Sequence, residues 1–147
     1  MVNQPSNRDS EADPLIIPYR VRLADTDAAG VVYFAHLLHI CHTAYEEVLI
    51  TRNVNLQEYL KQGTIALPII HGEIDCLRPI FWGDLILIGL TPQFLTETEL
   101  LLEYELRRAE ETAQKILARG NTRHVCIHPK TRQRLPFPPE IRKALLV

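Results

Sequence analysis

Two acidic residues stand directly before a long apolar stretch, in the segment LADTDAAGVVYFAH at residues 23–36. A helix that begins after Asp25 and Asp27 would present unpaired backbone N–H groups and the positive end of its dipole, which together can stabilise an oxyanion. A carboxylate beside those groups can act as a general base or as a nucleophile toward a carbonyl. Both acids can also be ordinary helix caps, since Asp is a preferred capping residue. The spacing alone therefore leaves hydrolytic chemistry and helix capping as open interpretations.

A helical pattern follows the acidic segment. From about Val32 to about Arg52, apolar residues recur at the i, i+3, i+4, i+7 spacing of a helix. The faces outside that stripe also carry apolar residues, so we expect a helix that is surrounded by other elements. Further helical turns are predicted at 55–62, closed by Gly63. Residues 15–25 alternate between apolar and polar types from Tyr19 on, which predicts a half-buried strand.

Strand patterns dominate the rest of the chain. They lie at 64–80, from the turn at 83–84 to about Phe94, at 96–109 and at 112–128. Pro68 interrupts the first of these, so we expect a bent or bulged strand there. Small residues on one face of the last strand, such as Gly120, suit the close approach of a helix, and the prolines before residue 140 predict a terminal helical turn. An antiparallel sheet that curls around one long apolar helix would bury the apolar faces of both, which predicts an α+β fold.

The bulk properties limit the classes of protein. The 147 residues match one ordinary domain, for which we predict a disordered tail at 1–13 and a single folded domain at 14–147. The formal net charge of −2 gives no electrostatic case for binding nucleic acid or an anionic membrane surface. The apolar run LILIGL is far shorter than the about 20 residues of a membrane span. The three cysteines form no CxxC pair, which predicts reduced thiols in a cytoplasmic protein, without zinc or disulfides.

Several short blocks of the sequence carry a resemblance to a known family. The blocks DTDAAGVVYF, CHTAYEE, ALPIIHGEID, GDLI and RHVCI resemble hotdog-fold thioesterases of the 4-hydroxybenzoyl-CoA thioesterase type, and within them the branch that acts on naphthoyl-CoA. The resemblance spans roughly residues 20–128. It implies a hotdog fold, in which an antiparallel sheet wraps around one long central helix, and hydrolysis of an acyl-CoA thioester without cofactor or metal. It also implies a homotetramer built as a dimer of dimers, with a dimer as the alternative, and with each active site between two subunits.

The resemblance places the family's catalytic groups on the acidic segment. In the family the second acid of the D-x-D pair carries catalysis, which assigns that role to Asp27. The backbone N–H at the helix start, which falls on Phe34, would polarise the thioester carbonyl. Gly30, lacking a side chain, would let the substrate approach the backbone. For Asp25 we keep the structural interpretation, in which it braces the loop, and Asp27 remains open as either nucleophile or general base.

Histidines and one aromatic residue are candidates for the substrate pocket. Tyr33 and His36 lie at the predicted helix start, and His71 lies in the interrupted strand, where the family's wall faces the acyl group. We therefore expect these three residues to line the pocket. His36, His39 and His42 are crowded on one helix, and i, i+3 spacing can make a metal site. No carboxylate or cysteine completes that set at obvious spacing, so we expect no metal.

Basic residues near the end of the chain are candidates for contact with the phosphates of CoA. We predict this role for Arg123, Lys130 and Arg132, which belong to a basic group on the last long strand and its turn. Strand arginines also commonly do no more than solubilise a face. Glu73 shares a strand face with His71 by alternation, but the surrounding HGEID does not resemble the glutamate motif of sister hotdog enzymes.

The sequence is compatible with three classes of function, which we weigh against one another. We favour an acyl-CoA thioesterase for an aromatic acyl group, with broader aromatic or aliphatic specificity as the alternative. A hydratase or dehydratase on the same fold needs a histidine paired with an acid, and the signature patterns of those enzymes are missing. A non-catalytic acyl-binding hotdog protein would have no need for the intact Asp27 and its glycine loop.

Overall fold

The computed structural model describes residues 13–113 and 115–146. In chain order its elements are β1 (Leu15–Arg20), the short 3-10 turn η1 (Leu23–Asp25), α1 (Phe34–Thr51), α2 (Leu56–Gln62), β2 (Ile69–Cys76), β3 (Leu85–Thr96), β4 (Glu99–Arg108), β5 (Ile116–Val125) and α3 (Pro139–Leu146). The tail predicted at 1–13 lies outside the described residues except for Asp13. The division of the chain at residue 14 therefore stays a prediction.

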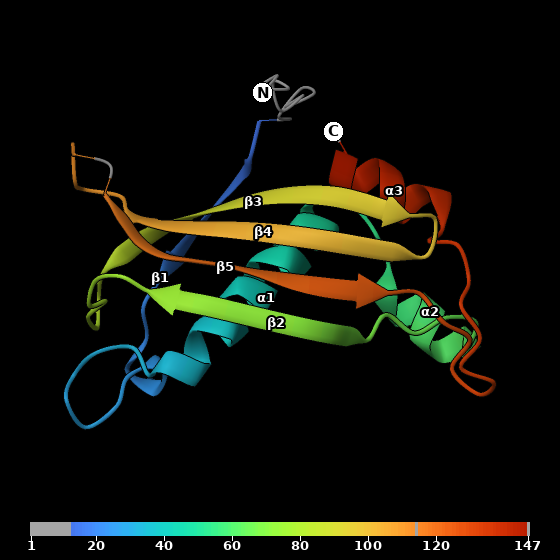
Figure 1. Ribbon diagram of the computed structural model, residues 1–147, viewed down its shortest axis with the longest axis horizontal. Coiled ribbons are helices and arrows are strands. Elements are labelled where there is room, and N and C mark those ends of the chain that lie inside the picture. The colour runs from blue at the N-terminus through green and yellow to red at the C-terminus, as the bar shows by residue number, and fades with distance from the viewer. Residues whose placement is uncertain (1–12, 114, 147) are drawn as a thin grey trace, which may run out of the picture.

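The strands form one five-stranded sheet in the order β1-β3-β4-β5-β2. Each neighbouring pair of strands is antiparallel. Helix α1 crosses one face of the sheet, and α2 and α3 lie near the same end of the molecule (Figure 1). An antiparallel sheet packed around one long helix confirms the predicted α+β hotdog architecture.

The core lies between α1 and the inner face of the sheet. The buried residues of α1 are Leu37, Ile40, Cys41, Ala44, Tyr45, Val48 and Leu49. They share one hydrophobic cluster with alternate residues of β3 and β4, namely Ile86, Ile88, Leu90, Leu100, Leu102, Tyr104 and Leu106. Most of the broad apolar arc of the helix is thus covered, but the helix is not surrounded as predicted, since Phe34 and Ile50 are 56% and 62% exposed. Among the described residues, no helix is both long enough and apolar enough to cross a membrane.

Gly120 of β5 allows β2 to lie close to the neighbouring strand. A Cβ at this position would lie 2.3 Å from the carbonyl oxygen of Glu73 and 2.7 Å from Cδ1 of Ile74. We predicted that small residues here would make room for a helix, but at Gly120 the close neighbour is β2. The glycine of β2 that faces the helix is Gly72, whose Cβ would meet the Leu38 side chain at 3.6 Å.

The strands predicted at 64–80 and 15–25 are among those that are shorter in the structure than the sequence pattern indicated. The segment at 64–80 contains β2 only at Ile69–Cys76, directly after Pro68. The register with β5 shifts between Ile69 and His71, which confirms the predicted irregularity. The segment at 15–25 is a strand only to Arg20, and Leu23–Asp25 form the 3-10 turn. That turn carries the chain from the sheet into the acidic segment.

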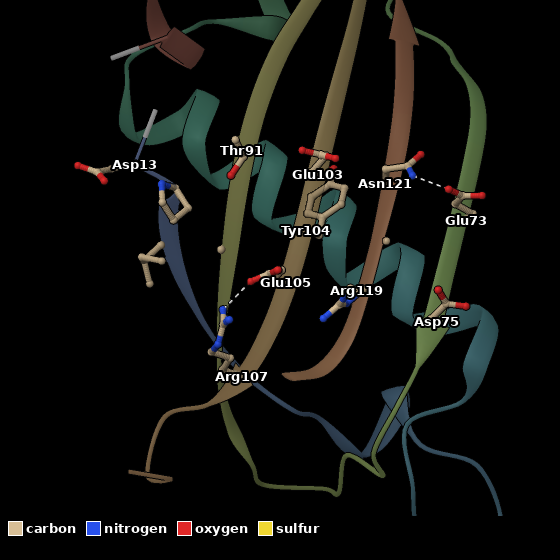
Figure 2. Close-up of a pocket in the computed structure, with 14 residues that line it drawn as sticks. Asp13, Glu73, Asp75, Thr91, Glu103, Tyr104, Glu105, Arg107, Arg119 and Asn121 are labelled. Carbon is tan, nitrogen blue, oxygen red and sulfur yellow. Dashed lines mark hydrogen bonds and ion pairs between the residues drawn. The ribbon is translucent and has the colours of Figure 1, made fainter. Parts of the chain in front are cut away.

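The face of the sheet opposite α1 is polar. Figure 2 shows Glu103 and Glu105 of β4 beside Arg119 and Asn121 of β5 on this outer face, which holds a groove of ≈ 570 Å³. The described residues that line this groove include none of the predicted catalytic residues. The candidate active site therefore lies elsewhere on the molecule.

Candidate active site

The chain between β1 and α1 forms a narrow loop, which we call the Asp27 loop (residues 26–33). The Asp27 N–H donates to the carbonyl oxygen of Val31 at 2.9 Å, and Thr26 and Val32 form an antiparallel bridge. Gly30 sits at the tip with φ +80°, where an added Cβ would meet nothing within 4 Å. Glycine is therefore favoured there by its backbone conformation and not by crowding.

The Asp27 carboxylate is exposed at this loop. Its Oδ1 accepts a hydrogen bond from the Ala29 N–H at 2.8 Å. Within the described part of the chain, Oδ2 has no hydrogen-bond partner and the side chain forms no ion pair. The carboxylate accepts from its own loop and not from a helix N–H, so the interpretation of Asp27 as a cap of α1 does not hold. Its charge is free to meet a substrate or a water molecule.

The start of α1 carries unpaired donors next to the Asp27 loop. Tyr33 occupies the N-cap position without a side-chain hydrogen bond, and the His36 N–H donates to the Tyr33 carbonyl at 2.8 Å. The N–H groups of Phe34 and Ala35 have no acceptor among the described residues. The first N–H groups of a helix and its dipole attract negative charge. Figure 1 shows the Asp27 loop projecting from this end of the helix.

Asp25 lies behind the loop and is 3% exposed. Its Oδ2 accepts hydrogen bonds from the Tyr19 hydroxyl and the Arg22 N–H, both at 2.8 Å. Its Oδ1 lies 2.8 Å from Nε2 of His36. Burial, and then the hydrogen bond to Asp25, raises the pKa of Tyr19 to about 12. Asp25 therefore has the surroundings of a brace, in contrast to the exposed Asp27.

A second turn supports the Asp27 loop, and the sequence alone did not reveal it. The Val32 N–H donates to the Ile80 carbonyl at 2.8 Å, and Val31 forms a bridge with Phe81. Trp82, which follows, is 66% exposed. The nearest sequence signal was the GD pair after Trp82, which predicts a turn but not its neighbour.

The other pocket candidates from sequence are spread apart. Tyr33 is 57% exposed at the helix start, beside His36. His71 and Glu73 project from the outer face of β2, with Nε2 of His71 3.7 Å from Oε2 of Glu73, and Oε1 of Glu73 accepts from Asn121 at 2.6 Å. Within one subunit the structure thus brings Tyr33 and His36 to the Asp27 loop, and it places His71 near the beginning of an edge strand.

The predicted phosphate-binding residues fall into two groups. Arg123 on β5 already forms an ion pair with Glu99. Lys130 and Arg132 are exposed in the turn after β5, and neither has an ion-pair partner within the described residues. Arg132 has a positive φ of 63°. Lys130 and Arg132 are therefore the more available cations for an anionic ligand.

A second cavity of ≈ 180 Å³ lies between α1 and α2. His42, Tyr45 and Glu46 of α1 line one side of it, and α2 with residues 65–67 closes the other. Nδ1 of His42 lies 3.0 Å from Oε1 of Glu46, and the buried Tyr45 hydroxyl has no partner among the described residues. No pattern in the sequence signals this cavity, because its walls come from segments that only the fold brings together. No cluster of three or more possible metal ligands occurs in the described residues.

Comparison with known proteins places this chain in a family. A model of the thioesterase-like superfamily matches residues 21–145, and the chain belongs to that superfamily. It is 48% identical over 123 residues to the 1,4-dihydroxy-2-naphthoyl-CoA hydrolase of Picosynechococcus sp., covering 82% of this chain and 84% of the relative. The hydrolase of the same name from Microcystis aeruginosa is 47% identical over 128 residues, covering 86% of this chain and 90% of the relative.

Solved structures give the same result for the fold. The crystal structure of a 1,4-dihydroxy-2-naphthoyl-CoA thioesterase from Synechocystis superimposes with a TM-score of 0.83 at 38% identity, covering 88% of this chain and 93% of that one. The dynemicin thioesterase superimposes with a TM-score of 0.81 at 21% identity, which shows a shared fold. The resemblance inferred from the sequence blocks is thereby confirmed.

Proposed function

We propose that this protein hydrolyses 1,4-dihydroxy-2-naphthoyl-CoA to 1,4-dihydroxy-2-naphthoate and CoA, a step of phylloquinone biosynthesis. The observation that carries the proposal is the exposed Asp27 carboxylate on the loop that leads directly into the uncapped start of α1. This arrangement occurs in a chain that is 48% identical to a hydrolase of that name. Thioester hydrolysis needs a base or a nucleophile and donors for the oxyanion, and a carboxylate and free N–H groups can supply them.

The chemistry follows from these two groups. The thioester carbonyl oxygen points at the N–H groups of Phe34 and Ala35, which stabilise the negative charge that develops during attack. Asp27 either attacks the carbonyl carbon to form a mixed anhydride or removes a proton from an attacking water. In both routes the C–S bond breaks and CoA leaves as a thiolate. A single turnover in ¹⁸O-labelled water distinguishes them, because only the anhydride route can leave an unlabelled oxygen of Asp27 in the first product molecule.

We propose a homotetramer, built from dimers that pair through the edge of the sheet. β2 lies at that edge and pairs within the described chain with β5 alone. Ile69 and Ile70 on β2 are 44% and 48% exposed, and an exposed apolar edge is usually paired or covered. Light scattering at micromolar concentration tests the assembly, and a 16.9 kDa species would contradict it.

The same pairing supports an active site between subunits. β2 runs from the α2 end of the molecule toward the end that carries the Asp27 loop (Figure 1). An antiparallel two-fold pairing of β2 strands would therefore bring the α2 end of the partner beside this Asp27 loop. Within one subunit, His42 lies eight positions after Phe34, about 12 Å along the helix axis, so the cavity beside His42 is distant from the helix start of its own subunit. We propose that the cavity of ≈ 180 Å³ of the partner receives the aromatic ring. A dry cavity of about 150 Å³ is enough to bind benzene.

Lys130 and Arg132 are proposed to contact the phosphates of CoA at the rim of the site, supported by their exposure and lack of ion-pair partners in the described residues. We also propose a cytoplasmic location. The free thiols of Cys41, Cys76 and Cys126 support it, since a reducing compartment keeps thiols reduced.

A thiol-release assay with a panel of acyl-CoA thioesters tests the proposed activity. We expect kcat/KM for 1,4-dihydroxy-2-naphthoyl-CoA to exceed that for palmitoyl-CoA by at least about 100-fold, or about 2.7 kcal/mol of transition-state binding. Equal values would contradict the substrate and leave a broader thioesterase. Tight binding of the naphthoyl thioester without thiol release would identify an acyl-binding protein.

A further inference from the structure

Asp25 connects three segments of the chain behind the Asp27 loop. Its buried carboxylate accepts hydrogen bonds from the Tyr19 hydroxyl on β1 and from the Arg22 N–H. The remaining oxygen lies 2.8 Å from Nε2 of His36, in the first turn of α1. A buried carboxylate is costly unless each oxygen has such a partner. The contact with His36 is therefore part of a defined arrangement, unlike an exposed ion pair.

Asp25 also fixes the start of α1 relative to the Asp27 loop. Its backbone carbonyl accepts a hydrogen bond at 2.9 Å from the N–H of Tyr33, the residue before the helix. Its carboxylate holds His36, three residues further along the same turn. Asp27 follows Asp25 by two residues. A shift of the first helical turn relative to Asp27 must therefore stretch one of these two contacts.

We propose that His36 is a positioning residue for thioester hydrolysis, an inference that rests on the proposed function. Its imidazole, held by Asp25, keeps the N–H groups of Phe34 and Ala35 in register with the Asp27 carboxylate. This role acts through Asp25 and does not require His36 to touch the acyl group. Reaction rates are sensitive to such placement, because a displacement of about 1 Å can cost about 100-fold in rate.

Three variants separate positioning from general stability. His36→Ala removes the contact with Asp25, and His36→Gln keeps a side-chain N–H donor on the same turn. Tyr19→Phe is the matched control, since it removes one hydrogen bond from the same carboxylate and leaves α1 untouched. For each variant kcat and KM are measured by thiol release, with the thioester from the panel that the wild type hydrolyses fastest, together with the melting temperature.

We expect kcat of His36→Ala to fall about 10- to 100-fold while KM changes by less than about threefold. His36→Gln should recover most of the loss. Tyr19→Phe should keep kcat within about threefold even where its melting temperature falls as far as that of His36→Ala. A kcat that follows the melting temperature across all three variants, or a fully active His36→Ala, would overturn the inference.

Amide hydrogen exchange gives a readout that does not depend on activity. We expect faster exchange over residues 26–37 in His36→Ala than in the wild type, and wild-type rates at the start of α1 in Tyr19→Phe. Unchanged exchange in His36→Ala would show that His36 does not fix the helix start. If the wild type hydrolyses no thioester of the panel, the proposed function is contradicted. The exchange measurement then still decides whether His36 fixes the start of α1.

Discussion

The buried imidazole of His124 should make the stability of this protein sensitive to mild acid. His124 lies on β5 with 0% exposure. Its Nε2 is 2.9 Å from Oγ1 of Thr122, while its Nδ1 has no partner among the described residues. The ring of Tyr45 packs against it with centroids 4.8 Å apart. Burial, and then the nearby His42, lowers the pKa of His124 to about 4. The folded protein therefore holds this imidazole neutral.

The sign and size of the pH effect follow from that pKa. Because the ordinary pKa of 6.5 is higher than the value of about 4 in the fold, the unfolded chain binds the proton more readily. The stability from a neutral His124 is fully present above about pH 6.5 and is lost as the pH falls toward about 4. Each tenfold difference in proton affinity is worth about 1.4 kcal/mol, so the total is about 3 kcal/mol.

Denaturant unfolding of the wild type and of His124→Phe measures this contribution. Between about pH 7.5 and about pH 4.5, the wild type should lose about 2.5 kcal/mol more unfolding free energy than the variant does. Phe fills a similar volume, and Thr122 keeps its hydrogen bond with the Tyr104 hydroxyl at 3.0 Å. Protein concentration is held constant, since subunit association also affects stability. Equal losses in the two proteins would refute the assignment of the acid sensitivity to His124.

Three further results are expected. Gly120→Ala should lower the unfolding free energy by about 1–3 kcal/mol in denaturant unfolding, because the new Cβ would lie 2.3 Å from the Glu73 carbonyl oxygen. An unchanged denaturation midpoint would show that β2 can move away from the new Cβ without loss of stability. Asp25→Asn should lower stability by about 0.5–2 kcal/mol with a modest loss of rate, and wild-type stability would contradict its role as a brace. Lys130→Ala and Arg132→Ala should raise KM for CoA thioesters and leave kcat unchanged, whereas unchanged KM values would exclude phosphate contacts.

Much of the fold was predictable, because its signals are local in sequence. A wide apolar arc between about Val32 and Arg52 predicts helix α1, and the helix begins at Phe34 and ends at Thr51. The alternation of apolar and polar residues predicts the strands of the sheet. The strand ends were less predictable, because the pattern of 64–80 continues past the point where backbone pairing stops at Cys76.

The site was predictable only in its local part. The family resemblance assigns roles to Asp27 and Phe34, which stay predictions, and the structure places both residues within one short segment between β1 and the start of α1. The contact between Asp25 and His36 joins residues eleven positions apart, and no periodicity reports it. The cavity between α1 and α2 depends on how the chain folds back on itself. Contacts and cavities between residues far apart in the sequence can be identified only once the fold is known.

Turnover by Asp27→Asn tests most directly whether the Asp27 carboxylate carries the reaction. The amide keeps the size of the side chain and removes its charge, so kcat should fall about 10²- to 10⁴-fold. The melting temperature should stay close to that of the wild type, because the carboxylate is exposed and accepts a hydrogen bond from its own loop at Ala29. A correctly folded Asp27→Asn that releases thiol at nearly the wild-type rate would contradict the catalytic role of Asp27.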